Sequence, residues 1–320
     1  MERSSGPGER RAFSSDEKTA RLLVDALDPV RFGHPGYLPW FYRENPRGEV
    51  IDENEDDERG NRIAHYAVIP TTYRTPAGPT PFIFSSNVAT SPTVRRGGLF
   101  RAMAERVYER AGATGAPGMV GVGNDNSTIV VVERFGWRAL GPLPVHICLP
   151  APGRSRAVES RAVDATLLAS PWFEAAAADL DWVPVADWVQ SWSPEFLRWR
   201  LSRPDGGYVL HVSPQALAVS VLAHAPLRVR CAVLLKVFPR PGAALPLSAA
   251  PLVAAACRYH RAPLCVYAGF NAHVQARGIP SPRRFQPSPL NLVFKSLDER
   301  RGPTATFRLD TFEFLDMDAY

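Results

Sequence analysis

Hydrophobic residues change their spacing near residue 99, where an extended pattern gives way to a helical one. Residues 62–72 and 81–89 carry alternating or continuous apolar side chains, which predict two β-strands that pair antiparallel. From residue 99 an apolar side chain returns at every fourth position, which places these side chains on one helix face. The positions are Leu99, Met103, Val107 and Ala111. The chain therefore runs from a strand into a helix through the turn at residues 91–98.

Two features precede these strands. Residues 16–27 have helical spacing and predict a short helix with Leu22, Leu23 and Leu27 turned inward. The acidic run at residues 52–58 lies between strand candidates, and we interpret it as a solvated hairpin loop. An acidic rim that attracts an amine is the alternative.

The second half of the chain repeats the order of the first. Residues 151–156 have the composition of a linker, and short helices follow up to residue 200. The strand–helix–strand order of residues 229–270 then echoes that of residues 82–123. The predicted elements are strands at 208–212, 217–222, 229–238, 264–270 and 306–315 and a helix at 252–261.

We therefore expect an α/β fold with mixed sheets, built from two tandem halves, the second a degenerate copy of the first. The expected division is a disordered N-terminus at residues 1–18, a first domain at 19–150 and a second at 151–320. A chain of 320 residues is long enough for two domains of ordinary size.

The turn before the first predicted amphipathic helix has the features of an anion site. The first peptide N–H groups of a helix have no partners within it, and the helix dipole adds positive charge there. Gly97 and Gly98 let an anion approach the backbone, and Arg95 and Arg96 supply cations. A basic turn before an ordinary surface helix is the alternative.

The segment Thr90–Phe100 resembles the acyl-CoA-binding motif of the GNAT N-acyltransferase superfamily, in which a strand and a Pro-containing loop lead to Arg/Gln-x-x-Gly-x-Gly/Ala at a helix start. Arg95 and Gly98 match this motif, whereas Phe100 stands where the family usually has a small residue. The following strand with its asparagine (119–124) and the Gly-aromatic pair (136–137) also resemble the family. The resemblance covers residues 35–148.

This resemblance implies a GNAT fold with acyl-CoA as co-substrate and an amine as acceptor. The backbone at Val88–Thr90 would bind the pantetheine arm and the acyl carbonyl, and the N–H groups from Arg96 onward would bind the pyrophosphate. Asn124 would contact the pantetheine arm. The expected CoA-binding residues are Val88, Ala89, Thr90, Arg95, Arg96, Gly97, Gly98, Leu99, Phe100, Asn124 and Ser127.

The catalytic groups are less well defined. Many family members have a tyrosine that protonates the leaving thiolate, and Val132 stands at that position here. A base is needed if the amine arrives protonated, and histidine suits this role. His65 and His211 lie on predicted strands, and His211 could face a cleft between the halves. A structural role for each histidine is the alternative.

Five of the seven tryptophans lie between residues 172 and 199. Tryptophan is frequent in binding pockets, so a groove between the halves could hold an acyl chain or an aromatic acceptor. Its predicted lining is Trp172, Trp192, Phe196 and Trp199. Packing in the core of the second half is the alternative.

The composition of the chain limits which ligands and partners we expect. The net charge of +5 suits an acidic ligand such as CoA, although a GC-rich genome also enriches arginine. There is no basic stripe with interleaved aromatics, so we expect no nucleic-acid partner. The four cysteines lack metal-ligand spacing and lie in apolar runs, which predicts buried free thiols and no metal site. No stretch resembles a signal peptide or membrane span, so we expect a cytoplasmic protein.

We predict an acyl-CoA-dependent N-acyltransferase in which the first half alone binds CoA, because the second-half turn at residues 239–243 carries two prolines without N–H groups. The tandem layout and the tryptophans resemble long-chain N-acyltransferases that acylate the glucosamine of teicoplanin-type glycopeptide antibiotics, which would make a glycopeptide pseudoaglycone the acceptor. The alternatives are acetyl transfer to a small amine or aminoglycoside-like compound, and a CoA-binding module without activity. The oligomeric state stays open.

Overall fold

The computed structural model describes residues 15–92, 98–151, 157–225, 228–282, 286, 290–298 and 307–317. Its helices are α1 (Ser15–Ala26), α2 (Pro29–Gly33), α3 (Tyr37–Arg43), α4 (Leu99–Ala113), α5 (Asp125–Phe135), α6 (Ala165–Leu168), α7 (Pro171–Ala176), α8 (Pro194–Leu201), α9 (Ala250–His260) and the 3-10 helix η5 (Phe314–Asp316).

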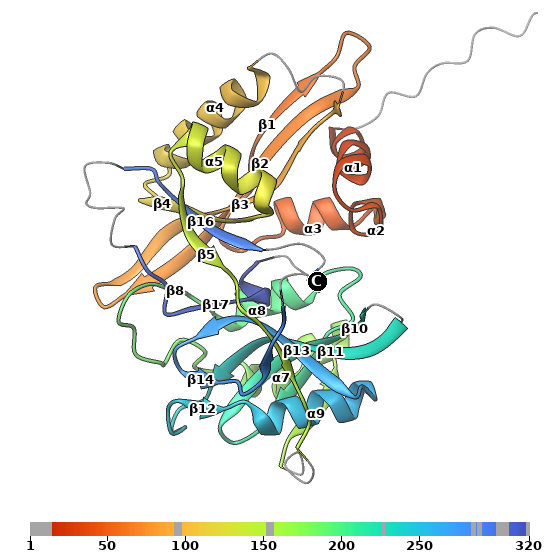
Figure 1. Ribbon diagram of the computed structural model, residues 1–320, viewed down its shortest axis with the longest axis vertical. Coiled ribbons are helices and arrows are strands. Elements are labelled where there is room, and N and C mark those ends of the chain that lie inside the picture. The colour runs from red at the N-terminus through yellow and green to blue at the C-terminus, as the bar shows by residue number, and fades with distance from the viewer. Residues whose placement is uncertain are drawn as a thin grey trace, which may run out of the picture.

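The first sheet is mixed and contains strands from both halves. Its order is β1-β2-β3-β4-β16-β5, and β8 pairs with β2. They are β1 (Ile51–Asp56), β2 (Arg62–Thr75), β3 (Gly78–Thr90), β4 (Gly118–Gly123), β5 (Arg138–Pro142), β8 (Val189–Gln190) and β16 (Asn291–Ser296). Helices α4 and α5 cover one face of this sheet and α1–α3 cover the other (Figure 1).

The second mixed sheet has the order β15-β6-β13-β11-β10-β9-β7, with β17 paired to β13. Its strands are β6 (Val145–Cys148), β7 (Glu159–Ala162), β9 (Val209–Val212), β10 (Ala216–Ala225), β11 (Val229–Pro239), β13 (Leu264–Asn271), β15 (Ile279–Pro280) and β17 (Thr311–Glu313). Strands β12 (Leu247–Ser248) and β14 (Val274–Gln275) pair separately. Helix α9 packs on one face, and the other face joins the core cluster that contains α3 and α8.

Each half is built around the same unit. In the first half β3, α4 and β4 form a parallel crossover, and in the second β11, α9 and β13 do the same. Met103, Val107 and Ala111 on α4 are fully buried, as the four-residue spacing predicted. The predicted α/β class with two tandem halves is confirmed.

The first half contributes β6 to the second sheet, and the second half contributes β8 and β16 to the first sheet. Strand β5 closes the first sheet, and the next strand, β6, enters the second sheet between β13 and β15. Strand β15 closes the second sheet, and β16 then returns to the first sheet between β4 and β5. The sheets therefore share strands across residue 150, where the sequence suggested a division between two domains.

The structure corrects several local expectations. Most of the acidic run is not a hairpin loop, because residues 51–56 form β1 and pair with β2; only Asp57 and Glu58 lie in the turn between these strands. Leu27 follows the end of α1 and is 50% exposed, although Leu22 and Leu23 are buried. Residues 15–18 are helical rather than disordered, while residues 1–14 lie outside the described residues. The strand expected at 306–315 is limited to β17, and η5 follows it.

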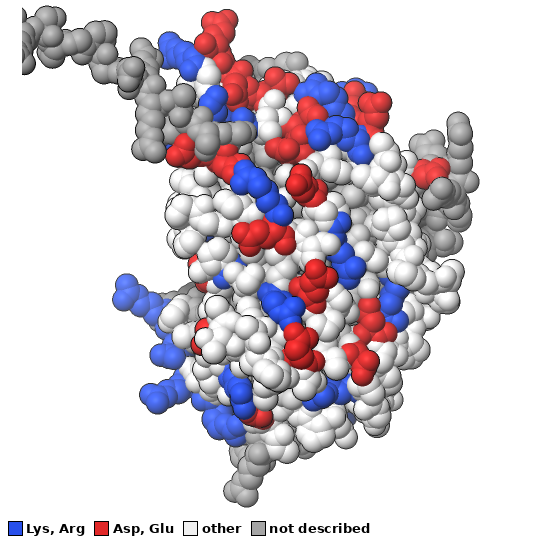
Figure 2. Space-filling view, turned by 180° about the vertical axis from the view of Figure 1, so that it is seen from behind, with Lys and Arg blue, Asp and Glu red and all other residues white. Residues whose placement is uncertain are grey.

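Ion pairs hold the acidic strand β1 against α4. Arg106 Nε and Nη2 contact Glu53 and Glu55 at 2.9 and 2.8 Å, and Arg110 Nη1 contacts Glu53 at 2.8 Å. These arginines keep the pKa of Glu53 below its ordinary value, although partial burial acts in the opposite direction. Acidic and basic side chains are accordingly interleaved over the upper part of the face in Figure 2. No described helix is long and apolar enough to cross a membrane.

Candidate active site

Strands β3 and β4 separate at the point where the first crossover leads into α4. Their parallel pairing ends at Ser85 and Gly121, although β3 continues to Thr90 and β4 to Gly123. Within the described strands β3 pairs with β2 and β4 alone. The last five residues of β3 therefore border a gap in the sheet on the β4 side.

A β-bulge lies in β3 just beyond this separation. Tyr66 of β2 pairs with Val88 and Ala67 pairs with Ser86, so Asn87 is an extra residue in the ladder. Asn87 has a φ of 50°, in the left-handed region that asparagine tolerates better than most residues.

The bulge sets the direction of the peptide groups that follow. The N–H of Ser91 donates to the carbonyl oxygen of Ile63 on the β2 side at 2.8 Å. Because N–H and C=O groups alternate in direction along an antiparallel strand, those of Thr90 and Val88 point toward the gap. Binding of a ligand by the backbone at Val88–Thr90 stays a prediction.

The helix start expected to bind the pyrophosphate is described only in part. Gly98 is the N-cap of α4 with a φ of 76°, and it has no side chain to cap the first N–H groups. Arg95, Arg96 and Gly97 lie outside the described residues. The ring of Phe100 stacks on Tyr66 at 5.9 Å and meets Phe135 edge-on at 5.3 Å.

Asn124 and Ser127 form the beginning of α5. Asn124 Oδ1 accepts a hydrogen bond from the Ser127 N–H at 2.9 Å, which caps the helix and leaves the Asn124 amide group facing solvent. Ile129 on the same helix is 55% exposed, and α5 has no buried residue. Val132 has no acidic proton to offer a thiolate.

His65 belongs to a buried polar chain beside the bulge. Asn87 Nδ2 donates to Tyr42 Oη at 3.0 Å, and Tyr42 Oη lies 2.8 Å from His65 Nε2. His65 Nδ1 lies 2.7 Å from Asn54 Oδ1, and Asn54 Nδ2 donates to Asp52 Oδ2 at 2.5 Å. Burial lowers the pKa of His65 to about 3 and raises the pKa of Tyr42, so both side chains are neutral near pH 7.

His211 does not face a cleft between the halves, contrary to the expectation from its strand position. It is fully buried on the sheet face covered by α9. Its Nδ1 lies 2.7 Å from Ser160 Oγ and its Nε2 lies 2.7 Å from Ser220 Oγ, which also contacts His260 Nε2 at 2.8 Å. Burial lowers the pKa of His211 to about 3. This environment suits a structural histidine.

The corresponding gap of the second half is filled by the chain itself. Parallel pairing of β11 with β13 ends at Leu234 and Tyr267, and β11 then has a bulge at Leu235. Strand β17 pairs with the end of β13, so closely that a Cβ atom on Gly269 would lie 2.1 Å from the Phe312 carbonyl oxygen.

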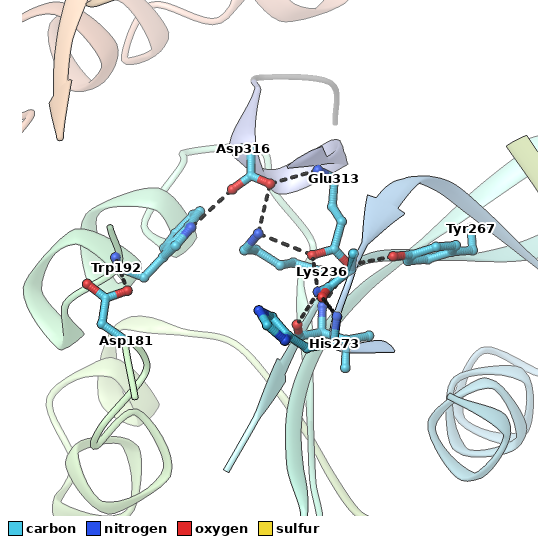
Figure 3. Close-up of polar contacts among 9 residues, drawn as sticks. Asp181, Trp192, Lys236, Tyr267, His273, Glu313 and Asp316 are labelled. Atoms are coloured by element: carbon cyan, nitrogen blue, oxygen red, sulfur yellow. Dashed lines mark hydrogen bonds and ion pairs between the residues drawn. The ribbon is translucent and has the colours of Figure 1, made fainter. Parts of the chain in front are cut away.

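The side chain of Glu313 on β17 fills this second gap and binds the polar groups that border it (Figure 3). Its carboxylate accepts hydrogen bonds from the Val237 N–H at 3.2 Å, Tyr267 Oη at 2.9 Å and Asn271 Nδ2 at 3.0 Å. Lys236 Nζ contacts Glu313 at 3.2 Å and Asp316 at 2.7 Å. Burial raises the pKa of Glu313, and the Lys236 ammonium opposes that shift. The peptide group of Val237 is thus bound internally.

The predicted aromatic groove is not formed. Phe196 and Trp199 are buried, and the Phe196 ring lies 5.2 Å from Trp199. Trp172 is half-buried, with the Arg161 guanidinium 4.4 Å from its ring. The physical reason is that α8 packs Phe196 and Trp199 into the core, where Trp199 stacks on Trp40 and Phe41 of α3.

Trp192 lines a pocket of about 300 Å³, its open mouth included, whose other walls include Arg74, Asp181, Lys236 and His273. Trp192 Nε1 also donates to Asp316 at 3.0 Å. Arg74 lies seven residues along β2 from Ala67, which is roughly 23 Å at about 3.3 Å per residue. The pocket is therefore remote from the bulge. The described residues contain no group of side chains able to hold a metal ion.

Neither Asn87 nor Tyr42 was expected as a site residue from the sequence. Asparagine is rare in strands, so its place within the predicted strand at residues 81–89 was the available signal for a bulge. Tyr42 was visible only as part of an aromatic segment.

No protein-family model and no curated protein sequence matches the chain. Solved structures do share its fold. A GCN5-related N-acetyltransferase from Anabaena variabilis is 10% identical with a TM-score of 0.59, over 88% of this chain and 70% of that one. One from Kribbella flavida is 11% identical with a TM-score of 0.57, over 88% and 69%. Saccharomyces cerevisiae N-myristoyltransferase, solved with bound myristoylCoA, is 8% identical with a TM-score of 0.52, over 87% and 79%. The chain thus has the GNAT fold in a tandem arrangement.

Proposed function

We propose that the chain is an acyl-CoA-dependent N-acyltransferase that binds one CoA thioester, in the first half. The observation that carries this proposal is the difference between the two gaps. The β3–β4 gap has peptide groups of Val88 and Thr90 directed into it and a helix start at its end, whereas Glu313 and β17 fill the β11–β13 gap. The GNAT fold and the N-acyltransferases among its structural neighbours support the same class of reaction.

In this proposal the first gap takes the pantetheine arm. The N–H groups at Val88 and Thr90 bind the arm and polarise the thioester carbonyl, the N-terminus of α4 at Gly98 binds the pyrophosphate, and the Asn124 amide contacts the arm. The exposed apolar side of α5 covers part of the bound donor.

The chemistry is direct attack of a neutral amine on the thioester carbonyl. A nitrogen–carbon bond forms, the carbon–sulfur bond breaks, and the proton lost by the amine passes to water or to the departing thiolate. His65 and His211 are both fully hydrogen-bonded, with pKa values of about 3, so neither acts as a base by direct contact. An amino-sugar amine loses its proton near neutral pH, which makes water a sufficient acceptor.

The finer proposal is a medium- or long-chain donor and the amino sugar of a glycopeptide antibiotic precursor as acceptor. Its support is the tandem GNAT layout, which the chain shares with an N-myristoyltransferase. The buried tryptophans give it no support. A panel of acetyl-, octanoyl- and decanoyl-CoA with glucosamine, an aminoglycoside and a glycopeptide pseudoaglycone tests it. Preference for acetyl-CoA would replace it by acetyl transfer to a small amine.

Titration calorimetry with CoA tests the binding site through a matched pair of variants. Gly98 opens α4 with a φ of 76°, and Gly242 precedes α9 with a φ of 85°. A Cβ atom at either position meets nothing within 4 Å, so Gly98→Ala and Gly242→Ala impose similar backbone strain without a steric clash.

We expect one CoA per chain, at least tenfold weaker binding for Gly98→Ala, and unchanged binding for Gly242→Ala. Equal effects of the two variants, or no heat with any CoA thioester, would contradict the proposed site. Release of free CoA with a cognate amine distinguishes an enzyme from a CoA-binding module without activity.

A further inference from the structure

The polar chain beside the first gap has one hydrogen-bond direction throughout. Asn54 Nδ2 donates to Asp52 Oδ2, so Asn54 presents its Oδ1 to the Nδ1–H of His65. His65 Nε2 then accepts from the Tyr42 hydroxyl, and Tyr42 Oη accepts from the Asn87 amide. The Asn87 side chain is therefore fixed by an uninterrupted series of bonds that begins at Asp52.

Burial makes this arrangement expensive unless each member is satisfied. The exposed fractions are 1% for His65, 5% for Tyr42 and 8% for Asn87. A buried polar group without a partner destabilises a fold, and apolar residues of similar shape could fill the same space. This series of hydrogen bonds ends at Asn87, the residue of β3 that has left-handed backbone geometry.

The conformation of Asn87 decides which peptide groups face the gap. Because alternate N–H groups of a strand point in opposite directions, loss of the one-residue bulge would reverse the set beyond it. Val88 and Thr90 would then turn toward β2, and Ala89 would turn toward the gap. The side chain of Asn87 is also held by Ser86 Oγ, which donates to its Oδ1 at 3.1 Å.

We infer that Tyr42 is a positioning residue for acyl transfer: through its hydrogen bond to Asn87 it holds the β3 bulge in the form that directs the Val88 and Thr90 N–H groups at the thioester. The inference rests on the proposed function. Tyr42 touches neither substrate, and its effect is exerted through the backbone of β3. Charge develops on the thioester oxygen in the transition state, so misdirected N–H groups lower kcat more than they weaken binding of the donor.

The substitution Tyr42→Phe tests this role, and Tyr73→Phe is its matched control. Both remove one hydroxyl from a buried tyrosine of the same core cluster. The Tyr73 hydroxyl has no hydrogen-bond partner within the described part of the chain, whereas that of Tyr42 joins His65 to Asn87. We expect Tyr42→Phe to lower kcat at least tenfold with KM for acyl-CoA within twofold of wild type. Tyr73→Phe should keep both constants within twofold.

A second variant acts at the other end of the bond. Asn87→Gly tolerates the positive φ but removes the side chain that Tyr42 holds. It should lower kcat by a similar factor, and Tyr42→Phe/Asn87→Gly should be no slower than the slower single variant, because both remove the same coupling. If Tyr42→Phe does not fold, Asn87→Gly decides the matter alone.

Wild-type turnover with acyl-CoA and an amine distinguishes failure of the proposed function from failure of the positioning role of Tyr42. Absence of turnover would overturn the proposed function and this inference with it. Turnover by wild type together with unchanged kcat in Asn87→Gly, strictly multiplicative losses in the double variant, or an equal loss in Tyr73→Phe would overturn the positioning role alone.

Discussion

Trp40 and Trp199 donate their indole N–H groups to each other's backbone carbonyl oxygens, at 2.8 and 3.0 Å. Their rings are stacked with centroids 5.3 Å apart. Trp40 lies on α3 of the first half and Trp199 on α8 of the second. The pair is therefore a structural connection between the halves, and it explains why a buried tryptophan here pairs with protein rather than with a ligand.

Replacing Trp199 should affect stability rather than donor choice. We expect Trp199→Ala to lower the free energy of unfolding by about 3–5 kcal/mol, because it leaves a cavity and removes the indole donor to the Trp40 carbonyl oxygen. Trp172→Ala should cost less, about 1 kcal/mol, because Trp172 is half-buried and stacks on Arg161 at the surface. Urea unfolding measures both losses of stability. A change of acyl-chain preference in Trp199→Ala would support the hypothesis that Trp199 lines an acyl-binding groove.

Lys236→Met should be strongly destabilising at pH 7. It leaves the carboxylates of Glu313 and Asp316 buried without their cation, which costs about 3–5 kcal/mol. The pKa of Glu313 is already raised by burial and would rise further, so the folded variant takes up a proton more readily than the unfolded chain and its deficit shrinks toward pH 5.

The matched control for Lys236→Met is Lys18→Met. The ion pair of Lys18 with Asp56 is 2.8 Å long, close to the 2.7 Å between Lys236 and Asp316, but its side chains are 26% and 32% exposed. Such pairs contribute about 0–1 kcal/mol. Equal losses in the two variants by urea unfolding would show that the Lys236 cluster does not hold β17 in place.

The periodic elements could be predicted from the sequence because their burial follows local spacing. Helix α4 begins at Leu99 as its apolar positions indicated, and β2 and β3 pair antiparallel as expected. The acidic strand β1 could not be predicted in this way, because its carboxylates pair with Arg106 and Arg110 on α4, about fifty residues later in the sequence. Strand exchange between the sheets was also unpredictable, because a short apolar run such as that of β16 suits either sheet.

The candidate site was predictable where a motif is continuous in sequence. Strand β3 and helix α4 on either side of the turn could be predicted from neighbouring residues, whereas the hydrogen-bond series from Asp52 to Asn87 joins four separate segments through side chains. His211 shows the converse limit. Its place on a strand was predicted, but the face that it occupies depends on α9, which the spacing of residues 208–212 does not specify.

The four cysteines should be unreactive in the folded protein. All are free and buried, as their apolar surroundings predicted. Burial raises the pKa of Cys148 to about 11, so its thiolate is scarce at pH 8. We expect a disulfide reagent to label no thiol of the native chain within minutes and four after denaturation in guanidinium. Rapid labelling of one native thiol would contradict the burial of that cysteine.

Acid should destabilise the fold through its buried histidines. At pH 5 an imidazole of the unfolded chain, with its ordinary pKa of 6.5, binds a proton, whereas His65 and His211 have folded pKa values of about 3 and remain neutral. Their stability contribution is complete above pH 6.5 and is lost as the pH falls toward 3. Between pH 6 and 4.5 each of these two histidines should lower the free energy of unfolding by about 2 kcal/mol, because one pKa unit corresponds to about 1.4 kcal/mol.

The variant His211→Gln isolates this effect. Glutamine can still hydrogen-bond with Ser160 and Ser220 but does not titrate, so its unfolding free energy should fall less steeply between pH 6 and 4.5 than that of wild type. His224→Gln is the control, because His224 lies on the neighbouring strand β10 and is exposed. Urea midpoints across this pH window measure both slopes. Since the window lies above most of the carboxylate titration, parallel slopes for His211→Gln and wild type would mean that His211 is protonated in the folded chain.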